Sequence, residues 1–166
     1  MDQLLIKIQS ILSSNAIEDE NVLSNIVKSL FFGLWNFDKM INQHNLSTRI
    51  SELLVKIPKK NGLLFFKAMI EHLHQKWNLI DHHRINKFMQ LVRYMLAQSF
   101  KMCEKHKMAK KKIDAILLDK VYFFVLESKS ENNVGSGLVY HITDIYFEIC
   151  DQNMAQGATL ENLNIF

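Results

Sequence analysis

Hydrophobic residues recur along this chain at intervals of three or four positions, the spacing of an amphipathic α-helix. In residues 21–36, for example, Val22, Ile26, Leu30 and Leu34 are each four positions apart. Similar spacing is found in residues 1–14, from Met40 or Ser47 to 57, and in 63–77, 85–100, 113–125 and 138–149. The pattern therefore predicts an all-α protein of about seven helices.

The chain contains few residues that interrupt helices. It has one Pro and five Gly, too few for the many tight turns of a β-sandwich or barrel. Pro58 is expected to end the third helix, because its ring disfavours the helical conformation in the residue before it. Asn61-Gly62 is a turn signal, and residues 128–137 have the polar composition of a loop.

The length and composition favour one soluble domain. Nearly half of the 166 residues are hydrophobic, which is enough to build a single core. We expect one domain over residues 1–166, an irregular helical bundle or an armadillo- or HEAT-like stack, with 158–166 as a tail that could dock on it. No run of about 18 apolar residues could cross a membrane, and residues 1–14 lack the features of a signal peptide. The protein is expected to be soluble and intracellular, without a membrane partner.

Three local features predict particular packing or capping roles. Gly33 interrupts the helix of residues 21–36, so a close approach by a neighbouring helix is expected there. Asp81 is a good N-cap for the helix that follows it. Glu18, Asp19 and Glu20 precede a helix, whose positive end favours carboxylates.

The sequence offers no recognisable catalytic or metal site. It lacks the phosphate-binding, nucleophile-elbow and zinc-protease motifs. His72 and His74 are two positions apart, so on a helix they cannot face the same ion. Cys103 and Cys150 are flanked by apolar residues and are expected to be buried, reduced thiols. We therefore expect a protein that is not an enzyme, with no metal, cofactor or small-molecule substrate.

The net charge of +3 conceals a strong asymmetry. Residues 61–112 carry a balance of +8, whereas residues 113–166 carry −6. The most basic stretch, called here the basic strip, consists of Lys101, Lys105, Lys107, Lys110, Lys111 and Lys112. A break between helices is expected within Lys105 to Lys112, because this stretch is basic and polar. If the helix instead continued through it, Lys101, Lys105 and Lys112 would lie near one face. Such a strip could bind phosphates without sequence selectivity, or it could be a solvated helix end.

Three blocks of residues stand out by their order and spacing. They are Leu30-Phe31-Phe32-Gly33-Leu34-Trp35 with Asp38-Lys39; Trp77, Ile80-Asp81, Arg84, Lys87-Phe88, Leu91 and Arg93; and Gly137-Leu138, Tyr140-His141, Asp144-Ile145-Tyr146 and Glu148. Together they resemble the ribosomal RNA processing protein 1 family of eukaryotic nucleoli, over residues 30–151. One block alone is weak, but the ordered set is specific.

The resemblance implies an all-helical, non-enzymatic factor of the nucleus and nucleolus. It would act as a scaffold in early precursors of the large ribosomal subunit and support the processing of precursor rRNA. Its expected partners are large-subunit assembly factors and that RNA. Larger members of the family also carry a long basic tail, and the functions of such a tail are not transferred to this chain.

Two sets of residues are candidates for these contacts. The RNA-binding set comprises the basic strip with Arg84, Lys87 and Arg93. The partner-binding set comprises Trp35, Asp38, Lys39, Tyr140, His141 and Asp144. Structural roles are open for both the aromatic and the polar members. On a helix, Tyr140 and Asp144 share a face while His141 points elsewhere.

Two other functions also fit the sequence. One is a helical protein-interaction adaptor without an RNA role, and the other is an uncharacterised helical enzyme acting on nucleic acid. Charge-dependent RNA binding would favour the scaffold over the adaptor. Converging carboxylates or histidines in a cleft would favour the enzyme.

Overall fold

The computed structural model describes residues 2–117, 119 and 136–155, and within them it contains seven α-helices, two 3-10 helices and no strand. This confirms the predicted all-α class. The elements are α1 (Asp2–Ser13), η1 (Asn15–Glu18), α2 (Glu20–Trp35), α3 (Met40–Lys56), α4 (Lys59–Lys76), η2 (Trp77–Leu79), α5 (Ile85–Lys105), α6 (Lys111–Leu117) and α8 (Ser136–Ala155). No described helix is both long and apolar enough to span a membrane.

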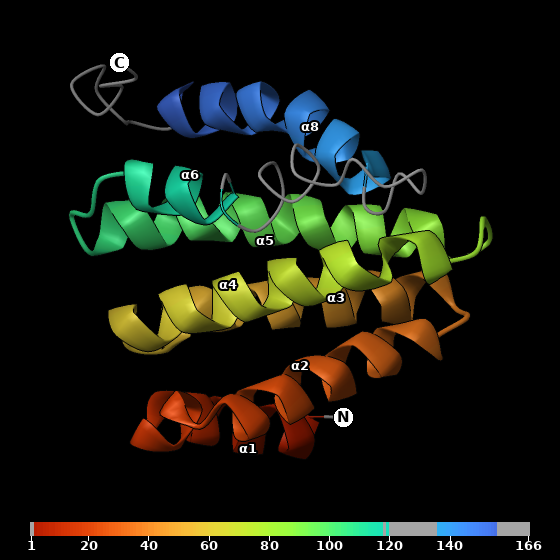
Figure 1. The fold of residues 1–166 in the computed structure, drawn as a ribbon, viewed down its shortest axis with the longest axis horizontal. Helices are drawn as coiled ribbons and strands as arrows, with labels where there is room; N and C mark the ends of the chain where they lie inside the picture. The colour runs from red at the N-terminus through yellow and green to blue at the C-terminus, as the bar shows by residue number, and fades with distance from the viewer. Residues whose placement is uncertain (1, 118, 120–135, 156–166) are drawn as a thin grey trace.

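The helices form a stack in which successive members run back and forth across the molecule (Figure 1). The stack begins with α1 and α2 at one side and ends with α8 at the other. The most extensive contact joins α3 to α5, and α8 packs on α5. The outer face of α8 therefore has no described helix beyond it.

One continuous hydrophobic cluster fills the stack from Leu5 in α1 to Cys150 in α8. The predicted seam of the last helix is confirmed, because Leu138, Ile142, Ile145 and Ile149 are all buried. Burying one such side chain stabilises the fold by about 1.5–3 kcal/mol before the entropy cost is subtracted. The spacing of apolar residues thus predicts which side of the helix faces the core.

Carboxylates help to start two of the helices. The side chain of Asp19 accepts a hydrogen bond from the backbone N–H of Asn21 at 2.8 Å, which confirms the predicted capping at the start of α2. Asp81 accepts from the N–H groups of His83 and Arg84 at 3.0 and 3.1 Å. These residues form a turn and α5 begins only at Ile85, so Asp81 caps the turn that leads into the helix.

The predicted turn at Asn61-Gly62 is wrong, because both residues lie in the first turns of α4. The Asn61 amide donates to the carbonyl of Leu12 at 2.7 Å and thereby ties α4 to α1. A Cβ added to Gly62 would lie 2.6 Å from the Met102 sulfur and 3.1 Å from the Leu54 carbonyl oxygen. The two residues that form a turn signal in the sequence therefore serve close packing between helices.

The close approach predicted at Gly33 is also wrong. A Cβ there would meet only Leu46 Cδ2 at 3.9 Å, which is ordinary van der Waals distance. Cys103 and Cys150 are free and buried, as predicted. Other expectations, including helical residues 121–125, most of the 128–137 loop and the 158–166 tail, lie outside the described residues.

Candidate functional site

The predicted break between Lys105 and Lys112 is confirmed, so Lys101, Lys105 and Lys112 do not lie along one continuous helix. The helix α5 ends at Lys105, and Lys107 adopts a left-handed conformation with φ of 47°. The backbone N–H of Met108 then donates to the carbonyl of Cys103 at 2.8 Å, which closes the helix end. The chain reverses there and starts α6, so the strip wraps around one end of the stack.

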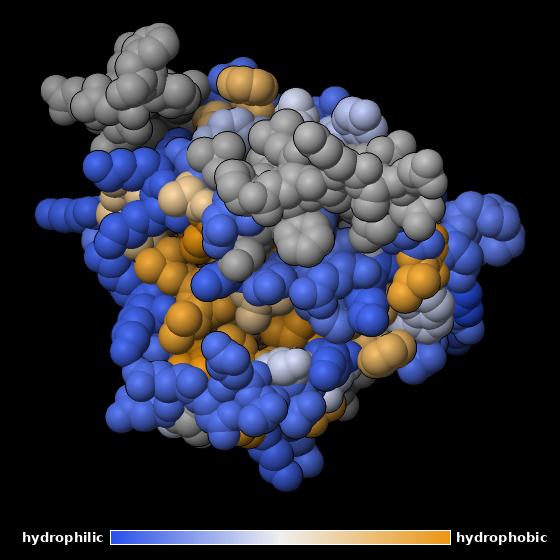
Figure 2. Space-filling view, in the orientation of Figure 1, coloured by the Kyte–Doolittle hydropathy of each residue, from blue (hydrophilic) through white to orange (hydrophobic). Residues whose placement is uncertain are grey.

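The end of α5, which carries the first lysines of the strip, lies beside the junction of α3 and α4. The Lys105 ammonium donates to the backbone carbonyl of Val55 near the end of α3, at 2.5 Å. At the start of α4, Gly62 faces Met102 of α5. Both junctions lie at the left edge of Figure 1, and hydrophilic side chains project from that edge in Figure 2.

The combined surface is called the basic end below, and it includes lysines that sequence reasoning missed. It consists of Lys56, Lys59 and Lys60 together with Lys101, Lys105, Lys107, Lys110, Lys111 and Lys112. In the sequence, the first three lysines are about 40 positions or more from the others. Only the antiparallel packing of the helices brings the two groups together.

The charges at the basic end are mostly exposed and weakly compensated. Burial raises the pKa of the Cys103 thiol to about 11, and the Asp114 carboxylate adds to that shift, whereas the nearby charges of Lys110, Lys59 and Lys112 oppose it. Three ammonium groups from two junctions thus act on one thiol. Two exposed ion pairs, Lys56 with Glu52 at 2.6 Å and Lys60 with Glu18 at 2.5 Å, also lie at this end.

Several lysines of the basic end remain available to an external anion. Lys59, Lys101, Lys107, Lys111 and Lys112 form no ion pair with a described carboxylate. Exposed pairs such as those of Lys56 and Lys60 contribute at most about 1 kcal/mol and can be exchanged for phosphate.

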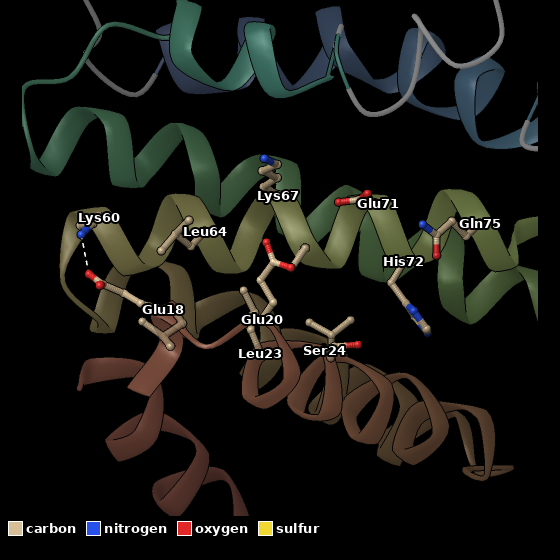
Figure 3. Close-up of a pocket in the computed structure, with 13 residues that line it drawn as sticks. Glu18, Glu20, Leu23, Ser24, Lys60, Leu64, Lys67, Glu71, His72 and Gln75 are labelled. Carbon is tan, nitrogen blue, oxygen red and sulfur yellow. Dashed lines mark hydrogen bonds and ion pairs between the residues drawn. The ribbon is translucent and has the colours of Figure 1, made fainter. Parts of the chain in front are cut away.

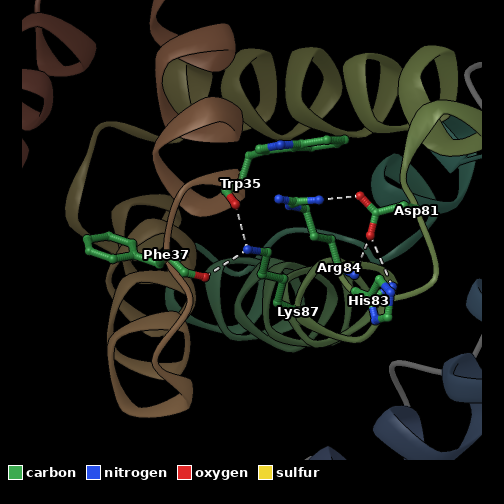
Figure 4. Close-up of polar contacts among 6 residues, drawn as sticks. All are labelled: Trp35, Phe37, Asp81, His83, Arg84 and Lys87. Carbon is green, nitrogen blue, oxygen red and sulfur yellow. Dashed lines mark hydrogen bonds and ion pairs between the residues drawn. The ribbon is translucent and has the colours of Figure 1, made fainter.

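Lys87 is placed inside the fold, so we remove it from the RNA-binding set (Figure 4). The residue is 5% exposed, and its ammonium donates to the carbonyls of Trp35 and Phe37 at 2.7 and 2.8 Å. Trp35 is the last residue of α2 and Phe37 lies just beyond it, at the helix end where the dipole favours a cation. Burial lowers the pKa of Lys87. Its role in this structure is to hold the end of α2 against α5.

Arg84 and Arg93 are engaged in contacts within the protein. The Arg84 guanidinium pairs with Asp81 and lies 5.0 Å from the centre of the Trp35 ring (Figure 4). Arg93 donates to Glu148 of α8 at 2.7 Å. Arg84 and Lys105 lie at opposite ends of α5, about 30 Å apart by helix geometry. Arg84 is therefore not part of the basic end.

The first two sequence blocks meet in the core. The ring of Phe31 on α2 stacks on Phe88 of α5 with centroids 4.6 Å apart, and Trp35 lies 6.1 Å from the same Phe88 ring. These aromatic residues are buried or half-buried. Their order in the sequence therefore reflects a helix contact that the fold requires.

The second and third blocks also meet. A Cβ on Gly137 would lie 2.8 Å from Trp77 Nε1, so only glycine allows α8 to start this close to the indole. The His141 ring stacks over Trp77 with centroids 6.3 Å apart, and its Nε2 lies 2.9 Å from the carbonyl oxygen of Met89. Burial lowers the pKa of His141, which favours a neutral ring that donates to this carbonyl. The position of His141 therefore supports a structural role for this residue in place of a contact with a partner protein.

The remaining partner-binding candidates lie on two elements. Asp38 and Lys39 are exposed between α2 and α3, where Trp35 is half-buried. Tyr140 and Asp144 are exposed on α8, and Tyr140 retains 70% of its accessible surface. The predicted separation of Tyr140 and Asp144 from buried His141 is confirmed.

An open groove of about 620 Å³ lies along the junction of α4 with η1 and α2 (Figure 3). Its polar lining includes Glu18, Glu20, Lys60, Glu71 and His72. Glu18 is paired with Lys60, and His72 packs edge-on against Phe31 with ring centroids 5.1 Å apart. Burial is the main cause that lowers the pKa of His72. Nowhere in the described part of the chain do three His, Cys, Asp or Glu side chains form a group that could hold a metal.

Comparisons with known proteins identify the family. A family model described as nucleolar protein Nop52 matches residues 2–165. A ribosomal RNA processing protein 1 homolog of Dictyostelium discoideum is 31% identical over 160 residues, which cover 87% of this chain and 32% of that protein. In Homo sapiens, homolog B is 30% identical over 76% of the chain and 16% of its own length, and homolog A is 28% identical over 76% and 27%.

The chain thus spans a third or less of the length of these relatives. The family model, in contrast, covers nearly all of the chain. The resemblance carried by the three sequence blocks is thereby confirmed, and the chain belongs to the ribosomal RNA processing protein 1, or Nop52, family of nucleolar proteins.

Proposed function

We propose that this protein is a non-enzymatic scaffold of early large-subunit precursor particles, and that it contacts precursor rRNA through the basic end. The names of its relatives connect the family with ribosomal RNA processing. The single observation that carries the RNA contact is the joining of the basic strip to Lys56, Lys59 and Lys60 by the fold.

The chemistry of the basic end suits a phosphate backbone. Ammonium groups on flexible stems attract phosphates as point charges and release the counterions condensed on the RNA. The basic end itself has few aromatic side chains, and the Phe100 ring beneath Lys110 is buried. Binding would therefore depend on charge and shape, with little selection among bases.

A salt titration with lysine variants tests this proposal. Fluorescence anisotropy would measure the affinity for a labelled fragment of large-subunit precursor rRNA between about 50 and 200 mM salt. Replacing Lys107, Lys111 and Lys112 with Gln should weaken binding. It should also reduce the salt slope by about 0.7 for each lost contact with a single strand.

A second triple variant tests the contribution that only the structure assigns. Changing Lys56, Lys59 and Lys60 to Gln should weaken binding comparably, although these residues lie outside the basic strip. The matched control changes three exposed lysines elsewhere, Lys7, Lys28 and Lys39, to Gln and should leave the salt slope nearly unchanged. If all three variants lost the same RNA affinity, the net charge of the protein would explain the binding. That result would contradict a defined RNA-binding surface at the basic end.

Purification of the tagged protein from its native cell tests the scaffold role. Precursor rRNA that retains spacer sequence should be enriched, and the basic-end variants should lower that enrichment. Unchanged recovery of the particle with these variants would instead favour the adaptor that binds only proteins. Cleavage of the same RNA by the purified protein with Mg²⁺ or Mn²⁺ would contradict the non-enzymatic proposal.

A further inference from the structure

The outer face of α8 carries a regular stripe of aromatic and acidic side chains. Tyr140, Asp144, Phe147 and Asp151 are separated by four, three and four positions, so they lie within a narrow band along three turns of the helix. Tyr140 is 70% exposed and Phe147 is 66% exposed. We call this set the α8 stripe; it presents two large rings and two carboxylates in alternation.

Within the described part of the chain, no ion pair compensates the negative charge of the α8 stripe. The helix contains no Lys or Arg. Glu148, on the flank of the stripe, is neutralised by Arg93 at 2.7 Å, whereas Asp144 and Asp151 form no ion pair with a described cation. An approaching basic group would therefore meet two available carboxylates.

The position of α8 makes this face accessible to a partner. The opposite face packs on α5, and α8 forms the last described layer of the stack (Figure 1). Both rings remain largely exposed, although the Phe147 ring also lies edge-to-face against Tyr146, with ring centroids 5.6 Å apart. The exposed parts of the two rings can receive the aliphatic stem and cationic head of Arg or Lys.

The chemistry of the α8 stripe discriminates among possible occupants. RNA would be repelled, because its phosphates would approach Asp144 and Asp151. An apolar helix would cover the rings but desolvate both carboxylates without a partner. A basic helix would cover the rings and also pair with the carboxylates. Its cations, placed every three or four residues, would match the spacing of both groups along α8.

We propose that the α8 stripe binds an Arg- and Lys-rich helical segment of a partner protein. This inference adds a protein-binding surface to a molecule whose basic end is suited to RNA. If both surfaces were occupied, the protein would connect RNA to a basic partner protein, and only this connection rests on the proposed function. The contact at α8 is independent of it.

Binding can be measured by NMR with a defined probe. An alanine-based helical peptide with arginine at every fourth position would be titrated into the isotope-labelled full chain, with a glutamine version of the peptide as control. The arginine peptide should shift the backbone amide signals of the α8 stripe. The glutamine peptide should bind at least about tenfold more weakly, since it lacks the cations.

Two double variants separate the aromatic and acidic contributions. Tyr140→Ser with Phe147→Ser should weaken peptide binding about fivefold to tenfold through the loss of two cation–π contacts. Asp144→Asn with Asp151→Asn should weaken it by a similar factor. Both pairs are exposed, so the spectra of the variants should otherwise retain the native pattern. Unchanged affinity in the aromatic variant would overturn the proposal, because diffuse charge would then suffice.

A charge-matched control and two further measurements complete the test. Glu20→Gln with Glu71→Gln removes the same charge from the groove between α2 and α4 and should leave peptide affinity within about twofold. Equal weakening by this control, or signal shifts centred away from α8, would overturn the proposal. A dimer in sedimentation equilibrium that the stripe variants dissociate would also overturn it, because a second copy would then be the occupant. RNA affinity should be unchanged in the stripe variants, so failure at α8 is distinguishable from failure at the basic end.

Discussion

The same substitution at two helical glycines should have opposite effects on stability. Gly62 and Gly33 both lie within helices, but their surroundings differ. A Cβ at Gly62 would lie 2.6 Å from the Met102 sulfur and 3.1 Å from the Leu54 carbonyl oxygen, whereas a Cβ at Gly33 would meet only Leu46 at 3.9 Å. Gly62→Ala should therefore destabilise the protein and Gly33→Ala should stabilise it.

The magnitudes follow from two opposing effects. Replacing Gly with Ala in a helix interior gains about 0.5–1 kcal/mol from the lower entropy of the unfolded chain. At Gly62 the buried Met102 side chain must move by about 1 Å, and the Leu54 carbonyl belongs to the backbone of another helix and can yield little. Overpacking of this kind costs about 1–3 kcal/mol. The free energies of unfolding of the two variants should thus differ by about 2 kcal/mol.

Urea unfolding monitored by circular dichroism provides the measurement. With an m-value of about 2 kcal/mol/M, the midpoints of the two variants should differ by about 1 M, with wild type between them. In a Met102→Ala background the cost of Gly62→Ala should shrink, because the nearer obstacle is gone. Equal midpoint increases for both alanines would refute the close contact between α4 and α5.

Two further predictions concern hydrogen bonding and pH. The Tyr146 hydroxyl donates to Asp114 Oδ1 at 2.6 Å, so Tyr146→Phe should lower the free energy of unfolding by about 1–2 kcal/mol in urea titrations; an unchanged midpoint would contradict this. Burial lowers the pKa values of His72, His74 and His141. The unfolded chain therefore binds protons first as the pH falls through about 6.5, and stability should decline from about pH 7 to pH 5. His141→Gln should flatten that decline, whereas constant stability over this range would count against neutral buried histidines.

Local periodicity was sufficient to predict the helices because the core lies on one side of most of them. Leu138, Ile142, Ile145 and Ile149 were recognisable as a buried seam from spacing alone. Residue types alone were misleading at Asn61-Gly62, where the pair indicates a turn but lies within α4. There, contacts with α1 and α5 outweigh the local preference, and no neighbour in the sequence reveals them.

The candidate surfaces were only partly predictable, since exposure depends on which helices meet. Lys87 carries the charge that is typical of a surface residue, but in the fold its ammonium donates to two carbonyls at the end of α2. His141 and Tyr140 are adjacent in the sequence, yet one fills the core and the other points outward. A helix turns by about 100° for each residue, so the sequence predicts that the two diverge but not which of them meets a partner.

The sequence by itself determined the all-α class, the hydrophobic seams and the family, because each is recorded in residue types at short or fixed spacings. The tertiary structure alone decided that Lys56, Lys59 and Lys60 join the basic strip, and that the α8 stripe faces outward from the last layer. The physical reason is that charge acts through space. Antiparallel packing brings distant helix ends within reach of one another, and the order of the stack determines which faces remain in water.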